Sequence, residues 1–393
     1  MSAALGRLAC QRNSFLKELA TTVVSCVRAP KLKDTFHVVC QDSILFPEGG
    51  GQPGDFGVLQ LVATPATTVP VTKVFPENGQ CVLQTSHEFQ VGEEVLMTLD
   101  WPRRHDHMQQ HSAQHLISAI AETKLGLDTT TWSLGATRCN VEFNSTSVTQ
   151  AQLDGLEQAV NEAIAAARPV AAHYKDETSD VRIVVMDGLD SNPCCGTHVQ
   201  HTAQLQCVKF LYSEVARGCT RIWFVAGNRV FKEFSAMFER EKVMTKLWSC
   251  PPEDHVQRLQ KVLAAQSASA KEQKALRLEL ASLLAAQLVQ SPAKYAHLHR
   301  DDADAAFLQA IAAAFHALGA EAPKVLLLTA GDTKAGDGAM VLSGPEAFVA
   351  AEAKTIAGLL DGKGGGRNGL FQGKVKRLGN LPAVLEHLEQ LHL

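Results

Sequence analysis

Residues 107 to 115 read HMQQHSAQH, and the histidine spacing in this stretch is the strongest structural signal in the sequence. Its histidines, His107, His111 and His115, recur at every fourth position. Residues four apart lie on one face of an α-helix, so a helix here would present a row of imidazoles. Asp100-Trp101-Pro102 precedes the stretch as a capping Asp with a Pro just inside, which predicts a helix start there and an end near Thr123.

A second segment with metal-ligand spacing, PCCGTHVQH, begins at residue 193. It offers Cys194 and His198, which converge only if CCGTH forms a turn of helix or a tight loop, and Gly196 permits either. Two histidines from the helix with this cysteine and histidine suit tetrahedral Zn²⁺, which takes mixed N and S ligands at about 2.0–2.3 Å. Two alternatives stay open: His107 pairs with His111 as well as His115 does, and a lone cysteine is often a buried apolar residue.

Composition places the chain among ordinary globular proteins. Its 393 residues predict two to four domains, with 46% hydrophobic and 20% charged residues. The net charge of −4 means that any nucleic acid must be bound by local basic patches. Ten scattered cysteines fit a reducing compartment, and no apolar run approaches the roughly 20 residues that span a bilayer. We therefore expect a cytoplasmic protein.

We expect an α+β multidomain fold that opens with a β-barrel-like domain at residues 1–98. Short β-type runs such as TTVVSCV and FHVVC are separated there by Pro and Gly clusters. Among them LFPEGGGQPGDFG cannot be regular structure. Its glycines and the following glutamine predict a loop whose backbone can closely approach a neighbouring group; these residues are Gly49, Gly50, Gly51 and Gln52.

The three later domains differ in composition. Residues 99–250 combine the histidine helix with an amphipathic helix at 150–167 and strands at 181–186, 204–212 and 221–226, which indicates an α+β core. Residues 251–290 contain no Gly after Pro251-Pro252 and predict a long helix or helical hairpin, as a spacer or dimer arm. Residues 291–393 alternate Ala-rich helices with strands and contain a second Gly-rich loop, GKGGGRNG.

These motifs resemble a known family. QQHSAQHLISA, PCCGTHV and LFPEGGGQPGDFG are similar to the editing domain of alanyl-tRNA synthetases and, in particular, to the freestanding AlaX-type editing proteins. ARGCTRIWFVAG and GKGGGRNGLFQG look like further motifs of that family, in the same order. The resemblance implies that one zinc ion is bound by His111, His115, Cys194 and His198. It therefore implies that His115, and not His107, is the ligand that pairs with His111. Cys195 stands where the family commonly has Gly, and Ser43 where it commonly has Thr.

The resemblance implies hydrolysis of tRNA(Ala) mischarged with serine, or with glycine. With no room for a synthetase catalytic domain, we expect no aminoacylation. A serine-selective editor cannot exclude the smaller alanine by size, so a buried polar group must pair with the serine hydroxyl. We expect Ser43 to provide it together with the Gly-rich loop. Four protein ligands fill a tetrahedral shell, which favours zinc positioning the ester over zinc activating water.

Cationic side chains near the motifs are candidates for tRNA phosphate contacts, with plain solvated charges as the alternative. They are Arg103, Arg104, Arg217, Arg221, Lys363, Arg367 and Lys374. A homodimer through the helical segment or the last domain is a further expectation. Two rival functions remain: a zinc-dependent hydrolase or deaminase of small molecules, and a zinc-stabilised RNA-binding scaffold without catalysis.

Overall fold

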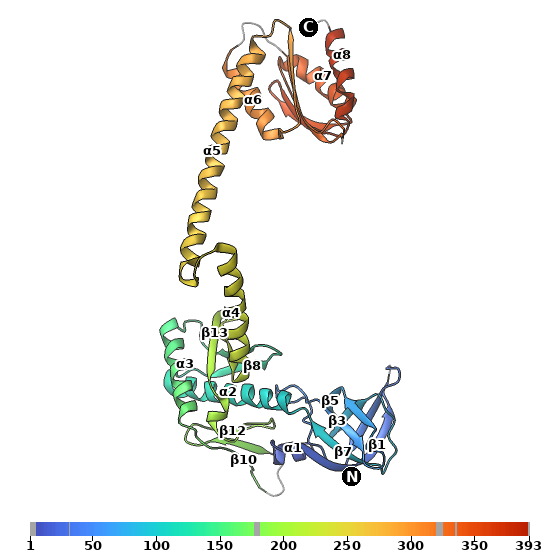
Figure 1. Cartoon of the computed structure of the whole chain (residues 1–393), viewed down its shortest axis with the longest axis vertical. Helices are drawn as coiled ribbons and strands as arrows, with labels where there is room; N and C mark the ends of the chain where they lie inside the picture. The colour runs from blue at the N-terminus through green and yellow to red at the C-terminus, as the bar shows by residue number, and fades with distance from the viewer. Residues whose placement is uncertain (1–4, 31, 177–180, 320–324, 335, 392–393) are drawn as a thin grey trace. The chain divides into compact units, whose positions relative to one another are not determined.

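The computed structural model describes residues 5–30, 32–176, 181–319, 325–334 and 336–391 and is drawn in Figure 1. It divides into two compact units, Met1–Val243 and Met244–Leu393. Among the described residues, no helix is both long enough and apolar enough to cross a membrane.

The first unit begins with a nearly closed antiparallel sheet, which agrees with the predicted barrel-like fold of this region. Its strands are β1 (Glu18–Arg28), β2 (Phe36–Cys40), β3 (Gly57–Leu61), β4 (Thr68–Val71), β5 (Lys73–Glu77), β6 (Gln80–Thr85) and β7 (Glu94–Leu99). They are ordered β4-β3-β7-β1-β2-β6-β5, and β4 returns to contact β6. Alternate residues such as Val38, Leu59 and Val95 fill the interior and are buried. The short helix α1 (Ala9–Arg12) precedes β1.

The rest of the first unit is built around α2 (Trp101–Leu125). Asp100 caps this helix by accepting a hydrogen bond from the Arg103 backbone N–H, and Gly126 ends it with a left-handed φ of 63°. The predicted histidine helix is therefore confirmed. Every side chain from residue 107 to residue 117 is buried, since sheets and α3 (Gln150–Ala165) surround the helix.

Two small sheets accompany α2. One has the order β13-β14-β9-β8, from β8 (Thr129–Leu134), β9 (Cys139–Phe143), β13 (Val208–Ala216) and β14 (Cys219–Ala226). The other pairs β10 (Val170–Tyr174), β11 (Arg182–Met186) and β12 (Asp190–Pro193). The strand predicted at 204–212 is wrong at its start, because η1 (Thr202–Leu205) is a 3₁₀ helix. The Asn161 side chain hydrogen-bonds both the backbone N–H and the carbonyl of Val208, the first residue of β13.

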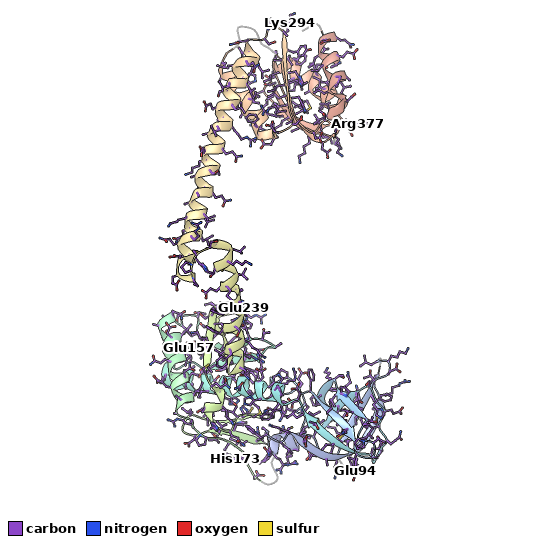
Figure 2. The ribbon with its side chains drawn as sticks, in the orientation of Figure 1. Glu94, Glu157, His173, Glu239, Lys294 and Arg377 are labelled. Carbon is purple, nitrogen blue, oxygen red and sulfur yellow. The ribbon has the colours of Figure 1, made fainter. Side chains whose placement is uncertain are left out.

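Two long helices follow the sheets. They are α4 (Asn228–Trp248) and, after η2 (Pro252–Asp254), α5 (His255–Val289). Of the two predicted forms, the structure has one continuous helix rather than a hairpin within 255–289. Residues 261–276 of α5 are exposed, and their side chains project from the ribbon in Figure 2. Towards its end Ala281 and Ala285 are buried against α6.

The second unit closes with a sheet ordered β15-β16-β17-β19-β18, covered by three helices. Its elements are β15 (Tyr295–Arg300), α6 (Ala305–Ala317), β16 (Val325–Gly331), β17 (Gly338–Ser343), α7 (Glu346–Leu359), β18 (Lys363–Arg367), β19 (Leu370–Val375), η3 (Leu378–Asn380) and α8 (Leu381–Gln390). The second Gly-rich motif is therefore not a loop throughout, since its glycines 364–366 form the edge strand β18.

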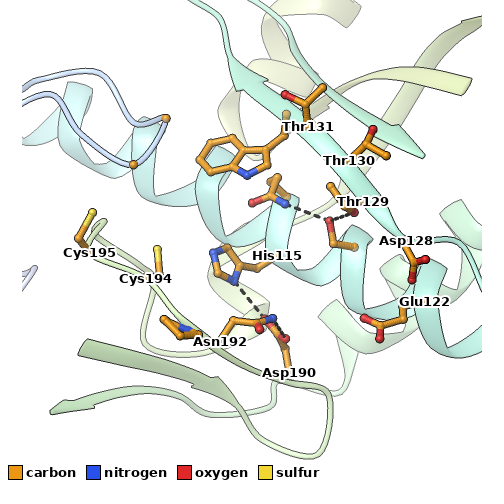
Figure 3. Close-up of a pocket in the computed structure, with 16 residues that line it drawn as sticks. His115, Glu122, Asp128, Thr129, Thr130, Thr131, Asp190, Asn192, Cys194 and Cys195 are labelled. Atoms are coloured by element: carbon orange, nitrogen blue, oxygen red, sulfur yellow. Dashed lines mark hydrogen bonds and ion pairs between the residues drawn. The ribbon is translucent and has the colours of Figure 1, made fainter. Parts of the chain in front are cut away.

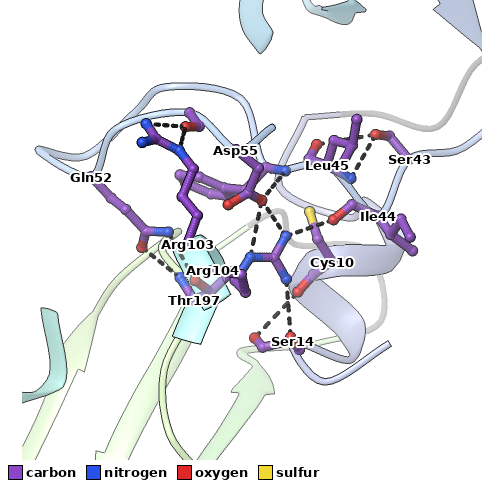
Figure 4. Close-up of polar contacts among 12 residues, drawn as sticks. Cys10, Ser14, Ser43, Ile44, Leu45, Gln52, Asp55, Arg103, Arg104 and Thr197 are labelled. Carbon is purple, nitrogen blue, oxygen red and sulfur yellow. Dashed lines mark hydrogen bonds and ion pairs between the residues drawn. The ribbon is translucent and has the colours of Figure 1, made fainter. Parts of the chain in front are cut away.

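Arg104 is fully buried, and its hydrogen bonds, drawn in Figure 4, join α2 to the barrel. Its Nε donates to Asp55 Oδ2 at 2.9 Å, and its terminal nitrogens donate to the carbonyls of Ser14 and Ile44 at 2.9 and 2.6 Å. The prediction that Arg104 contacts tRNA is wrong, because no part of this side chain reaches the surface. A buried arginine with a paired carboxylate instead fixes the start of the histidine helix.

We expect Arg104→Met to lower the free energy of unfolding by about 3–5 kcal/mol, because it leaves the Asp55 carboxylate buried without its counter-charge. Urea denaturation followed by circular dichroism measures this. Arg240→Met, at an exposed position on α4, is the control and should change stability by less than about 0.5 kcal/mol. Adding Asp55→Leu to Arg104→Met should restore part of the loss. Equal stability of Arg104→Met and wild type would contradict this role for the ion pair.

Candidate metal centre

Four potential metal ligands from two distant segments meet in the first unit. They are His111 and His115 on α2, and Cys194 and His198 on the segment after β12, with donor atoms all within 4.8 Å of one another. Cys194 Sγ lies 3.5 Å from His111 Nε2 and 3.2 Å from His198 Nε2. His107 is buried but outside this group, so the residues converge in the register His111–His115.

The segment from residue 194 to residue 199 is a tight loop and contains no helical turn. Gly196 is required in it, because a Cβ there would lie 2.2 Å from Cε1 of His111. Arg182, itself buried, donates to the carbonyl oxygens of Cys194 and Gly196 at 3.0 and 2.7 Å. Gln11 Nε2 donates to the Cys195 carbonyl at 3.1 Å. Sequence reasoning missed both supporting side chains.

Each histidine of the group uses Nδ1 for a contact with a protein side chain. His111 Nδ1 lies 2.9 Å from Gln52 Oε1, His198 Nδ1 lies 3.0 Å from Ser112 Oγ, and His115 Nδ1 lies 3.0 Å from Asp190 Oδ2. Such contacts orient the rings and leave Nε2 for a metal, which is the usual arrangement around ligating histidines. The residues present therefore fit a metal ion with three nitrogen donors and one sulfur donor.

Protonation of the group also suits metal binding. Burial opposes ionisation of Cys194, but hydrogen bonds with His111, His115 and His198 outweigh it and lower the pKa of the thiol to about 2. Burial lowers the pKa of His198 to about 3. Burial likewise acts against the charged form of His115, but Asp190 and Cys194 raise its pKa to about 9. Without metal the thiolate thus has a charged imidazole beside it, and metal binding would release that proton.

A pocket of about 790 Å³ opens beside these ligands, and Figure 3 shows its lining. Gly50, Gly51 and Cys195 belong to its lining. A Cβ on Gly51 would lie 2.5 Å from the Trp132 ring, and that ring lies over His111 with centroids 5.0 Å apart. In Figure 3, Glu122 and Asp128 lie at the end away from Cys194 and Cys195, on the far side of His115. The volume is that of a typical small-molecule site.

The Gly-rich loop reaches this centre through Gln52, which is buried. Besides the contact with His111, its carboxamide accepts from the Thr197 N–H at 2.9 Å and donates to the Thr197 hydroxyl at 2.8 Å. Gly49 pairs with the Gln52 backbone across the loop and does not line the pocket. The structure thus brings Gln52 to the centre as a support for a ligand.

Ser43 lies elsewhere, in the barrel core (Figure 4). Its hydroxyl donates to the Leu45 carbonyl and accepts from the Leu45 N–H, both at 3.0 Å. It does not line the pocket. Cys195, the other departure from the family pattern, is exposed at the pocket wall, where a Cβ on Gly50 would meet its sulfur at 2.8 Å.

The arginines of the first unit that were predicted to contact tRNA differ in how far protein groups already engage them. Arg103 donates to the Gly54 carbonyl, with its guanidinium 4.0 Å from the centroid of the Phe56 ring. Arg221 is bound to Glu142 and Glu214, which neutralise its charge. Arg217 is exposed at the turn between β13 and β14. In the second unit Lys363, Arg367 and Lys374 are all exposed on β18 and β19.

Comparison with known proteins adds to this geometry. Residues 181–222 match the family described as the threonyl and alanyl tRNA synthetase second additional domain. The chain is 38% identical to the mouse "Alanyl-tRNA editing protein Aarsd1", over 94% of both chains. It is 35% identical to the zebrafish protein of the same name, again over 94% of both. It is also 29% identical to "Alanyl-tRNA editing protein AlaX-L" of Pyrococcus horikoshii, over 57% of this chain and 59% of that one.

We expect Gln52→Met to weaken metal binding by roughly 10- to 100-fold, because His111 loses the carboxamide that orients its ring. Competition with a chromophoric chelator, using Zn²⁺ and Co²⁺, measures the affinity. Gln158→Met, on the exposed face of α3, is the matched control. Circular dichroism must show that both variants fold. Unchanged affinity in a folded Gln52→Met protein would remove Gln52 from the support of the centre.

Proposed function

The chain belongs to the family of alanyl-tRNA editing proteins, and on that basis we propose that it hydrolyses the ester of tRNA(Ala) mischarged with serine. Glycine is the second candidate for the mischarged amino acid. The observation that carries the proposal is the convergence of His111, His115, Cys194 and His198 beside an open polar pocket. A purely structural metal site would have no need of a pocket at its edge. The proposal is of hydrolysis alone, without aminoacylation.

We propose Zn²⁺ as the metal, held by these four side chains, since mixed imidazole and thiolate ligands suit it. When bound it supplies a positive charge that can position the ester and polarise its carbonyl. Outer contacts from Gln52, Ser112 and Asp190 keep the histidine rings oriented for that task. The thiolate state of Cys194, favoured by its three histidine neighbours, is the form that binds metal.

The pocket supplies the groups for binding and selecting the aminoacyl end. The backbone of Gly50 and Gly51 lies at its wall and can donate N–H groups to a developing oxyanion. Selection of serine over alanine requires a polar partner for the hydroxyl. Because Ser43 does not line the pocket, we assign that role to the pocket hydroxyls Ser118 and Thr129. Trp132 lines the same pocket, with its ring packed against His111.

Contacts with tRNA phosphates must come from outside the pocket. Arg217 remains a candidate in the first unit, and Lys363, Arg367 and Lys374 remain candidates in the second. Lys363 and Lys374 are directly opposite each other on β18 and β19, so the strand pair presents concentrated positive charge. Such charge favours a nucleic-acid backbone. Arg103 and Arg221 are weaker candidates, because each is already engaged by protein groups.

We also propose that the protein self-associates through α5. Leu259, Leu263, Leu276, Leu280 and Leu283 of this helix are exposed. Exposed leucines at helical spacing are typical of helix–helix interfaces. Sedimentation velocity at several protein concentrations tests for a dimer.

We expect wild-type protein to release serine from Ser-tRNA(Ala) at least ~10-fold faster than alanine from Ala-tRNA(Ala). Cys194→Ala should lose the metal and both activities while remaining folded. The assay follows acid-precipitable amino acid, with metal content measured in parallel. A companion reaction with uncharged tRNA, ATP and alanine should yield no aminoacyl-tRNA. A folded, metal-loaded protein that cleaves neither ester would refute the proposal and favour a non-catalytic RNA-binding protein.

A further inference from the structure

The pocket beside the metal ligands has an unusual balance of charge. Of the described residues that line it, three are acidic, namely Glu122, Asp128 and Asp190, and none is lysine or arginine. The imidazole of His115 also lines the pocket, and it is paired with Asp190. The nucleic-acid substrate of the proposed function is a polyanion. A pocket of this composition repels phosphate and attracts a cation. Only the aminoacyl end of the substrate offers one, as its α-ammonium group.

The three carboxylates are not equally available. Asp190 accepts from His115 and from Asn192, so both of its oxygens are occupied. Asp128 accepts from the Asn144 side chain through one oxygen, Oδ2. Glu122 is exposed and has no side-chain hydrogen bond or ion pair among the residues that the structure describes. Negative charge is therefore free at the end of the pocket where Glu122 and Asp128 lie (Figure 3).

A second and independent feature is the amide of Gln114, a pocket residue that is only 5% exposed. Its Nε2 donates to Ser118 Oγ at 3.0 Å, and Thr129 Oγ1 donates to the same oxygen at 2.7 Å. Ser118 thereby orients the amide. The remaining atom, Gln114 Oε1, is buried and has no donor among the described residues. A buried acceptor without a donor is unfavourable, so this amide is suited to a ligand that brings an N–H or O–H group.

We propose that Gln114, with Glu122 and Asp128, recognises the free α-ammonium group of the aminoacyl ester. An ammonium group combines three donors with a positive charge, so it meets both the unpaired acceptor and the excess negative charge. The serine hydroxyl also donates, but it carries no charge. The ester oxygens accept only, and leave Gln114 Oε1 unpaired.

The consequence is a restriction on substrate class that rests on the proposed function. The protein acts on aminoacyl-tRNA with an unblocked amino group and rejects tRNA whose amino acid is N-acylated, including peptidyl-tRNA. An N-acyl group removes the charge and two of the three donors. A chain with this pocket can therefore release a wrong amino acid without attacking a growing peptide attached to tRNA.

The test compares Ser-tRNA(Ala) with N-acetyl-Ser-tRNA(Ala), with metal content and folding checked on every protein. Wild type should cleave the free-amine ester at least ~30-fold faster. Gln114→Met and the double change Glu122→Gln with Asp128→Asn should each reduce this ratio about tenfold, mainly by slowing the free-amine substrate. Gln114→Glu keeps the acceptor and should preserve the ratio. Glu162→Gln, an exposed change on α3, is the control and should have no effect.

A binding measurement separates this inference from the proposed function. The probes are 3′-serylamido-adenosine, which cannot be hydrolysed, and its N-acetyl derivative, titrated by calorimetry. Tighter binding of the free amine that is lost in Gln114→Met supports ammonium recognition, even if no ester is cleaved and the editing proposal fails. Equal cleavage of the two esters by wild type overturns the inference alone. So does a ratio that stays unchanged in folded Gln114→Met and in the double variant.

Discussion

The side-chain amide of Gln52 is the contact on which the centre depends. Its oxygen lies within hydrogen-bond distance of the His111 ring and the Thr197 backbone, and its nitrogen donates to the Thr197 hydroxyl. Three segments meet there: the Gly-rich loop of the barrel, the buried helix α2 and the ligand loop after β12. Arg104 and Arg182 add buried hydrogen bonds on either side of this junction. The barrel thus works as part of the site, because it supplies the group that orients one ligand.

Much of the local structure could be predicted because its signals are local. The capping Asp100, the fourfold spacing of the histidines and Gly196 are visible in the sequence and act within a few residues of each other. Convergence of the helix with a loop some eighty positions later depends on tertiary structure. The ligand types of the two segments suggested a shared metal site, and the family resemblance then indicated which histidines belong to it. Periodicity alone left His107 and His115 as equal partners for His111. The difference between them arises from which side of α2 faces the ligand loop.

The residues assigned least accurately are those whose role depends on burial. Arg104 follows an exposed-looking Pro102-Arg103, and nothing local distinguishes a buried arginine from a surface one. Its partner Asp55 lies 49 positions earlier in the sequence, at the end of the Gly-rich loop, so no local pattern connects the two residues. Ser43 stands at a family motif position, yet its hydroxyl bonds the backbone of Leu45. The outer partners Ser112 and Asp190 carry no sequence signal, because single Ser and Asp residues near histidines are common.

The separation of the ligands along the chain has a consequence for how the protein is made. His111 and His115 leave the ribosome several seconds before His198, at synthesis rates of about 5–20 residues per second. During that interval the nascent chain holds only the helical pair of donors, and the barrel that carries Gln52 is already complete. A metal ion held by all four side chains could therefore bind only after translation has passed β12 and the ligand loop has docked. Binding of an ion at this centre would therefore report that the barrel, α2 and the ligand loop have come together.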